Sequence, residues 1–470
     1  MWRTLVIVWG IACLCPSVLS AQWEPDFRLT YDDSISYLCY NNAWCVAAEG
    51  ETTHVVWHDS RHAIPEVYYK RSLDNGTTWE TDVRLTNWFG HSGCAAVAVA
   101  GTSVHVAWCD ERDGHFEIYY KRSIDGGMSW ASDTRLTYAD DCAVYPCIAV
   151  SGDYVHVVWM DTRDGVQVCE VYYKRSTDGG TTWGPDTRLT YNNCSAGMPS
   201  IAVLGANIHV AYSDHYDGNN EIYYMRSTDA GASWQQYVRL TNDNASSLNP
   251  SIAVAGSGVH VVWIDERDGN KEIYYKRAKG GGAAWSGDIR LTNAPDVSRH
   301  PSVSADGNNV HVVWCDRRTG ENDVYYKLST DYGVSWELDM QITHGSEEHS
   351  WYPSVAVSGT TVHVVWSDWR DGNFEIYYKR NPTGNTGVHE SMTQHAGVSL
   401  QECRTAPNPF SSHTIVQGHE EERFALYDSA GKLVGKYSGD RIGGDLPVGV
   451  YLLVPEMINA KPALIVKVGH

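Results

Sequence analysis

Hydrophobic and polar residues alternate along this chain in short runs, and the same set of runs returns about every 50 residues. In the segment 155–190, β-branched and aromatic residues alternate with polar ones over 155–159 and again over 170–175. Such alternation suits a pleated strand with one buried face. The pattern therefore predicts two strands joined by a polar loop, and a third strand that ends near Thr190 after a tight turn at 176–183.

The turn at 176–183 contains the residue types that tight turns use. Ser176 and Asp178 have short polar side chains that hydrogen-bond to nearby backbone, and the two glycines that follow accept positive φ angles. Trp183 ends the turn with a large ring that can pack beneath it.

A histidine in the strand before the polar loop marks the repeat. Seven copies are present, with spacings of 51, 51, 53, 51, 51 and 52 residues. A run of small residues, such as 199–203, precedes the histidine strand and supplies a further strand, so each unit has four. Seven four-stranded units are typical of a β-propeller or a solenoid. The marker residues are His54, His105, His156, His209, His260, His311 and His363.

The ends of the array distinguish a closed ring from a solenoid. The seventh unit stops at Arg380 without a turn or a fourth strand, whereas the segment 23–30 matches the fourth strand of the first unit at 79–86. A ring closed by one N-terminal and three C-terminal strands explains both features and leaves no exposed sheet edge. A solenoid would need caps instead. We therefore predict an all-β, seven-bladed β-propeller whose last blade is completed by an N-terminal strand.

The composition changes on both sides of the repeats. Residues 1–21 have a basic start, an apolar stretch and a small-residue end, which predicts a signal peptide. The propeller spans 22–380, and a linker follows over 381–397. Short strand-like runs over 398–470 predict a C-terminal immunoglobulin-like β-sandwich. We expect a secreted chain with no transmembrane segment in its mature form.

Composition and charge limit the classes of partner that this protein can bind. A formal net charge of −21 argues against nucleic acid or an anionic membrane surface as the main partner. The aromatic residues are 29 Tyr and 19 Trp against 6 Phe, which favours rings with a polar group, as at binding surfaces. No motif indicates a metal site or a cofactor. Export permits disulfides, which we expect between neighbouring loops that contain Cys39, Cys94, Cys142, Cys169 and Cys194.

The turn pattern Ser-x-Asp-x-Gly-x-x-Trp resembles the Asp-box, or BNR repeat, of sialidases and other secreted propellers. Five copies keep the pattern, and the segment 278–285 is a degenerate sixth copy without the Ser and the Asp. The resemblance implies a structural turn between the third and fourth strands of a blade, away from the catalytic face. The aspartates of the five copies are Asp74, Asp125, Asp178, Asp229 and Asp331.

Sialidases as a family hydrolyse terminal sialic acids with three arginines on the substrate carboxylate, an Asp acid/base and a Tyr–Glu nucleophile pair. Their Arg-Ile-Pro motif near the N-terminus is not found here, because the segment 27–30 in that place recurs as an ordinary fourth strand. Sialidase propellers are also six-bladed, whereas seven units are present here. The resemblance therefore covers the architecture of 23–380 and not the catalytic set.

The tail resembles the C-terminal sorting domain of type IX secretion substrates. The matching segments are 406–410, 426–434, 446–453 and 465–468. The resemblance implies contact with an export machinery, passage across an outer membrane, and attachment or release at the cell surface. The alternative is a plain immunoglobulin-like end module.

The loop between the second and third strands of a blade contains the residues best suited to bind a ligand. They follow the pattern Asp-x-Arg-Asp-Gly. Chain direction places this loop opposite the Asp-boxes, and Arg with flanking carboxylates can orient sugar hydroxyls or a carboxylate. The alternative is that Asp and Arg pair within each blade, because identical residues in every blade usually serve the repeat. The candidate ligand-binding arginines are Arg61, Arg112, Arg163, Arg267, Arg318 and Arg370.

Residues that break the repeat are better candidates for a single site. Four tryptophans lie outside the repeated positions, and exposed Trp suits stacking on a sugar, although such residues can also plug the channel. They are Trp44, Trp88, Trp351 and Trp369. With no identifiable catalytic set, the sequence favours a binding module for a glycan or a surface protein. The alternative is an exo-α-sialidase-like glycoside hydrolase, so whether the protein is an enzyme stays open.

Overall fold

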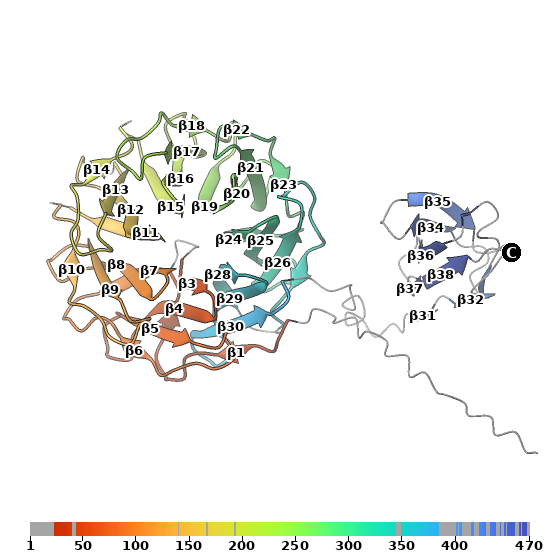
Figure 1. The fold of residues 1–470 in the computed structure, drawn as a ribbon, viewed down its shortest axis with the longest axis horizontal. Helices are drawn as coiled ribbons and strands as arrows, with labels where there is room; N and C mark the ends of the chain where they lie inside the picture. The colour runs from red at the N-terminus through yellow and green to blue at the C-terminus, as the bar shows by residue number, and fades with distance from the viewer. Residues whose placement is uncertain are drawn as a thin grey trace, which may run out of the picture. The chain divides into compact units, whose positions relative to one another are not determined.

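The computed structural model describes residues 23–384, with gaps at 40–43, 140, 166–167, 192–193 and 345–348, and parts of 401–467. The chain divides into two compact units, Met1–Gly387 and Val388–His470. The first unit is a ring of seven antiparallel sheets (Figure 1). The predicted all-β, seven-bladed propeller is therefore confirmed.

The first strand of each blade lies at the axis of the ring, and later strands lie further out (Figure 1). The first strands are β2 (Ser36–Tyr37) and β3 (Val46–Glu49), which share one blade, β7 (Ser92–Ala100), β11 (Ala143–Ser151), β15 (Ala196–Leu204), β19 (Ser247–Ala255), β24 (Ser298–Asp306) and β28 (Ser350–Ser358). The second strands are β4 (Thr52–Asp59), β8 (Ser103–Asp110), β12 (Tyr154–Asp161), β16 (Asn207–Asp214), β20 (Gly258–Asp265), β25 (Asn309–Asp316) and β29 (Thr361–Asp368).

The outer half of each blade contains a long third strand and a two-residue fourth strand. The third strands are β5 (Glu66–Ser72), β9 (Glu117–Ser123), β13 (Glu170–Ser176), β17 (Glu221–Ser227), β21 (Glu272–Lys279), β26 (Asp323–Ser329) and β30 (Glu375–Asn381). The fourth strands are β6 (Val83–Arg84), β10 (Thr134–Arg135), β14 (Thr187–Arg188), β18 (Val238–Arg239), β23 (Ile289–Arg290), β27 (Met340–Gln341) and β1 (Phe27–Arg28). In the degenerate Asp-box, β22 (Ala284–Trp285) pairs with the end of β21.

The ring is closed by the N-terminal strand. β1 pairs with β30 of the seventh blade, with Phe27 opposite Tyr378 and Arg28 opposite Tyr377. The predicted closure is confirmed, because the first described strand completes the last sheet.

The direction of the chain gives the ring two distinct faces. The loops from second to third strand, and from each fourth strand to the next blade, leave on one side, which we call the loop face. The hairpins at the ends of the first strands and the Asp-boxes leave on the other side, the Asp-box face. All candidate arginines therefore lie on the loop face.

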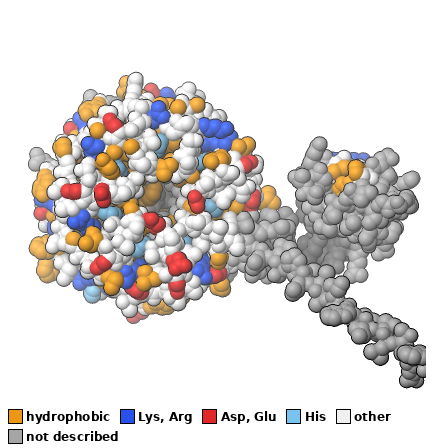
Figure 2. Space-filling model, viewed as in Figure 1, with side chains coloured by type: hydrophobic (Ala, Val, Ile, Leu, Met, Phe, Trp, Pro, Cys, Tyr) orange, Lys and Arg blue, Asp and Glu red, His pale blue; other side chains and the backbone are white. Residues whose placement is uncertain are grey.

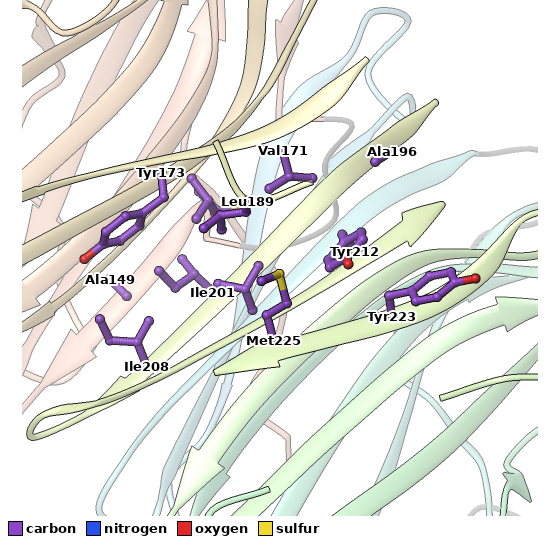
Figure 3. Close-up of a cluster of buried hydrophobic side chains, with 13 residues drawn as sticks. Ala149, Val171, Tyr173, Leu189, Ala196, Ile201, Ile208, Tyr212, Tyr223 and Met225 are labelled. Carbon is purple, nitrogen blue, oxygen red and sulfur yellow. The ribbon is translucent and has the colours of Figure 1, made fainter. Parts of the chain in front are cut away.

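The core lies between neighbouring blades. Figure 3 shows one cluster, in which Leu189 and Tyr173 of the third blade pack against Ile201 and Met225 of the fourth. Equivalent clusters join the other blades. Small residues in the first strands allow seven strands to converge around the axis.

The second unit contains a four-stranded sheet in the order β35 (Leu433–Ser438), β34 (Arg423–Asp428), β36 (Gly449–Pro455) and β38 (Ala463–Lys467). Two smaller pairs join β31 (Gln401–Glu402) to β37 (Ala460–Lys461) and β32 (Arg404–Ala406) to β33 (Ile415–Gln417). Across the described part of the chain, no helix is long and apolar enough to cross a bilayer.

Candidate functional site

The candidate arginines are bound by carboxylates of their own blade. In blade two, Arg112 donates two hydrogen bonds to Asp110, at 2.7 Å from Nε and 2.6 Å from Nη2, and a third from Nη1 to Asp133 at 2.8 Å. Its guanidinium lies over the Tyr119 ring, 4.3 Å from the centroid. The same pair of carboxylates recurs at Arg61, Arg163, Arg267, Arg318 and Arg370.

The carboxylate beneath each of these arginines belongs to a buried network. Asp110 is fully buried and also accepts hydrogen bonds from Trp108 Nε1 at 2.8 Å and Ser92 Oγ at 2.9 Å. Burial alone would raise the pKa of this carboxyl, but the bonds from Arg112 and Trp108 outweigh burial and hold the pKa below its ordinary value. The positive charge of Arg112 is thus balanced inside its own blade, as the alternative interpretation of these loops requires.

The Asp-boxes bond to their own turns on the other face. Asp125 accepts hydrogen bonds from Ser123 Oγ at 2.7 Å, Ser129 Oγ at 2.6 Å and the Ser129 backbone at 2.9 Å. The same side-chain bonds hold the turns of Asp74, Asp178, Asp229 and Asp331. These five aspartates therefore have their structural partners within the turn.

The first strands begin at the loop face with a bulge. In blade two the pairing of β7 with β8 shifts between Gly93 and Ala96, and blades three to seven repeat the shift. In each bulge a residue other than glycine has φ between 50° and 55°, a left-handed conformation that costs about 1 kcal/mol. The side chains at this position differ from blade to blade: Cys94, Tyr145, Met198, Asn249, His300 and Tyr352. The mouth of the channel is thus the variable part of a regular ring.

Aromatic rings gather on one side of this mouth. The His300 and Tyr352 ring centroids lie 4.7 Å apart, and Tyr352 and Tyr37 lie 6.0 Å apart. Phe374 lies 4.3 Å from Tyr37, and Trp351 lies 5.8 Å from Tyr352. We call these five residues, which come from blades six, seven and one, the mouth cluster.

Two further contacts extend the mouth cluster. The guanidinium of Arg299 lies over the Trp351 ring, 5.5 Å from the centroid. Trp369, which is 40% exposed, packs edge-on against Phe374 at 4.7 Å. The structure thus brings two of the predicted tryptophans, Trp351 and Trp369, to one site.

Two side chains of the mouth cluster, His300 and Tyr37, are uncharged near neutral pH. Burial, followed by the nearby charges of Arg299 and Lys271, lowers the pKa of His300 to about 3. Burial, followed by the neighbouring Tyr352, raises the pKa of Tyr37 to about 12. A neutral imidazole and a protonated phenol can stack and exchange hydrogen bonds, which suits a ligand rich in hydroxyl groups.

Trp44 lies inside the channel instead of at its mouth. It lines an axial cavity of about 230 Å³ together with small residues of the first strands, such as Ala98 and Ser302. Figure 2 looks onto one face of the ring and shows the hollow at its centre. The Trp44 ring packs against the core clusters of blades two to four, and its Nε1 is buried without a partner. Trp44 therefore fills part of the channel.

Trp88 lies at the rim, in the loop between β6 and β7. It is 54% exposed, and its ring rests on Arg112, 5.7 Å from the guanidinium carbon. The four predicted tryptophans thus occupy three places: the mouth, the channel and the rim.

The sequence pointed to Trp351 but not to Tyr37, His300, Tyr352 and Phe374. Three of these occupy the opening positions of the first strands, where the repeat varies most between units. Variation at a fixed position of the repeat was the available signal. The bulge that turns these side chains towards the mouth has no sequence signature of its own.

The prediction of disulfides between neighbouring loops is wrong for three of the described cysteines. Cys94, Cys142 and Cys169 have free thiols, so the disulfides expected for these described residues are absent. Cys94 belongs to β7 and hydrogen-bonds to Cys109 of its own blade, because the bulge places it in the sheet and not in a loop. Within the described ranges, no three His, Cys, Asp or Glu side chains are arranged to hold a metal ion.

Residues 19–261, more than half of the 470 residues, match the model of the BNR repeat-like domain family. The chain belongs to this family. A curated relative of this BNR propeller, the xyloglucanase Xgh74A of Acetivibrio thermocellus, is 22% identical over 369 residues. That match covers 70% of the chain, and the chain spans about 40% of the relative's length.

Solved structures of similar fold include carbohydrate-active enzymes. The polysaccharide lyase Uly1 is 11% identical with a TM-score of 0.50, over 77% of this chain and 99% of the lyase. The sialidase of Trypanosoma rangeli is 13% identical with a TM-score of 0.45, over 82% and 85% of the two chains. The fold of this BNR propeller thus also occurs in the polysaccharide lyase Uly1.

Proposed function

We propose that this BNR propeller binds a glycan at the mouth of its channel on the loop face. The observation that carries the proposal is the mouth cluster, in which rings from three blades gather where the repeat varies. Aromatic rings stack on the apolar faces of sugars, while phenol and imidazole groups bond to sugar hydroxyls. A surface protein is the other ligand that the aromatic composition allows.

The ion pairs of the loop arginines favour binding over sialidase-type hydrolysis. Such hydrolysis needs arginines that converge on one substrate carboxylate, whereas the six loop arginines are each paired with two carboxylates of their own blade. Releasing one of them would leave a buried aspartate without its partner, which is costly. The charge balance therefore supports a structural role for these arginines.

A glycan array followed by calorimetric titration tests the proposal. The array should include neutral polysaccharides such as xyloglucan and anionic ones such as alginate. Trp351→Ala should weaken binding about tenfold to a hundredfold, because a buried aromatic contact is lost. Leu248→Ala, at the same position of blade five, is the matched control and should change the affinity by less than about twofold. Equal affinities for both variants, or an array without binding, would contradict the proposal.

A glycoside hydrolase is the second candidate, and His300 is the observation that favours it. Burial lowers the pKa of His300 to about 3, so the imidazole stays neutral near pH 7 and can exchange hydrogen bonds with a sugar hydroxyl beside Tyr352 and Arg299. A fluorogenic sialoside and reducing-end assays on polysaccharides test this candidate. Turnover that is lost in His300→Asn, with binding retained, would establish catalysis, whereas binding without turnover leaves the lectin-like function.

We also propose export of the chain to the cell surface. The support is the signal-like segment 1–21 and the resemblance of 398–470 to sorting domains, with 381–397 as the linker. Fractionation of a bacterium with type IX secretion tests this: the full chain should reach the surface, and a chain that ends at residue 397 should stay in the periplasm. Surface display of the truncated chain would leave the tail as a plain immunoglobulin-like module.

A further inference from the structure

We propose a second glycan-contact surface on the loop face, made of exposed aromatic rings that rest on arginines at the rim. Tyr31, Tyr138 and Tyr191 each follow the Leu-Thr end of a fourth strand and are 67%, 72% and 70% exposed. They lie at the junctions of blades seven and one, two and three, and three and four. Trp88 occupies the junction of blades one and two, so exposed rings mark four successive junctions. We call the three tyrosines the rim platforms.

Each rim platform is held by a fixed cation. Below Tyr138, Arg135 donates to the Thr137 carbonyl at 2.8 Å and to Glu117 at 2.7 Å, and it pairs with Asp113 at 3.1 Å. The guanidinium carbon lies 4.5 Å from the ring centroid. Cation–π contact orients one face of the ring and leaves the other face to solvent. Arg28 under Tyr31 and Arg188 under Tyr191 each contact the equivalent threonine carbonyl, glutamate and aspartate of their own blades. Their guanidinium carbons lie 5.1 and 4.8 Å from the ring centroids.

The tyrosines are not needed to build the blade. In blades four and five, Arg239 and Arg290 keep all three contacts, to a threonine carbonyl, a glutamate and an aspartate. The residue above them is Asn242 or Asn293. Because the arginine network is complete without an aromatic ring, the rings on the other half of the rim serve something outside the blade.

The surroundings of the rim platforms fit a neutral polysaccharide. Each supporting arginine is matched by two carboxylates, so each site has a net negative charge, and the chain as a whole carries −21. This disfavours an anionic sugar polymer. Single rings separated by polar loops suit one sugar per ring, whereas a protein partner needs a contiguous patch. This surface rests on the proposed glycan binding and extends it from the mouth to a chain that crosses several blades.

Affinity electrophoresis of the full chain in gels with xyloglucan, arabinan, mannan, alginate or polysialic acid tests the inference. The variant Tyr31→Ala/Tyr138→Ala/Tyr191→Ala should bind a neutral polymer about thirtyfold to a thousandfold more weakly, since each of the three stacked rings contributes about threefold to tenfold. The matching triple Tyr→Phe variant should bind like wild type, because the ring is retained. Asn242→Ala/Asn293→Ala, at the same positions of blades four and five, is the control and should change nothing.

The outcomes separate this inference from the proposal for the mouth. If no polymer retards the wild-type chain, both fail. If Trp351→Ala loses retardation but the triple alanine variant does not, only the rim inference is overturned. Preference for alginate or polysialic acid overturns the neutral class. A loss of self-association in the triple alanine variant, measured by sedimentation, would instead assign the rim to contact between copies of the chain.

Discussion

Gly180 shows how closely one blade is fitted to the next. It lies in an Asp-box at φ +80°, and a Cβ added there would overlap the hydroxyl of Tyr120 in the preceding blade. Tyr120 is itself fixed by a 2.7 Å hydrogen bond to His105 Nδ1. We expect Gly180→Ala to lower the free energy of unfolding by about 3 kcal/mol, measured by urea denaturation, because backbone strain and overpacking add.

The control for this change is Gly152→Ala. Gly152 has a similar φ of +56°, but nothing lies within 4 Å of its Cβ position. The Gly152→Ala variant should lose only about 1 kcal/mol of unfolding free energy, which is the cost of an alanine in the left-handed conformation. Equal losses at both glycines would show that the contact between blades contributes nothing.

At the scale of elements, β1 is the part that closes the ring. Asp26, just before it, bridges Arg370 at 2.7 Å and Lys379 at 2.8 Å, as Asp133 bridges Arg112 and Lys121 in blade two. Removing residues 1–31 should lower stability by more than about 3 kcal/mol, because it leaves buried charges unpaired and exposes the edge of β30. Thermal melting and sedimentation should show a lower melting temperature and self-association. Removal of 1–22 is the control, and a synthetic 23–31 peptide should restore part of the lost stability.

The elements also show what sequence can and cannot predict here. Closure by β1 was predictable because 23–30 repeats a fourth strand that stands elsewhere in every complete unit. The pairing of Arg112 with Asp110 was one of the two interpretations of its loop, but its second partner, Asp133, was not predictable, because it lies 21 residues away and only the fold brings the two together. The mouth cluster was not predictable for a related reason, because a register shift in the first strand decides where Tyr352 points. Local pattern predicts elements, whereas the site depends on pairing between them.

At the scale of the whole molecule, seven buried histidines link stability to pH. Burial lowers the pKa of these histidines to between about 3 and about 4, and an N–H formed at Nε2 of His156, for example, would have no hydrogen-bond acceptor. The unfolded chain, with histidine pKa values near about 6.5, binds more protons below that pH than the folded chain does. Stability should therefore fall as the pH falls from about 6.5 to about 4.

Carboxylates act in a lower window, since the pKa of Asp74 and that of Asp331 are about 2 and their contribution is lost only below about pH 4. Between about pH 6.5 and 4 the histidines therefore set most of the slope, and two carboxyls whose pKa burial raises, Asp323 and Glu375, act in the opposite direction. Urea denaturation across this range should show a stability slope that His156→Gln reduces by about one proton, or about 1.4 kcal/mol per pH unit, because glutamine does not titrate. An unchanged slope would mean that His156 is protonated in the folded ring, and the neutral His156–Tyr173 pair, with its 2.7 Å hydrogen bond, would need revision. Because the hydrophobic core lies between neighbouring blades, acid should open the ring in one cooperative step and not blade by blade.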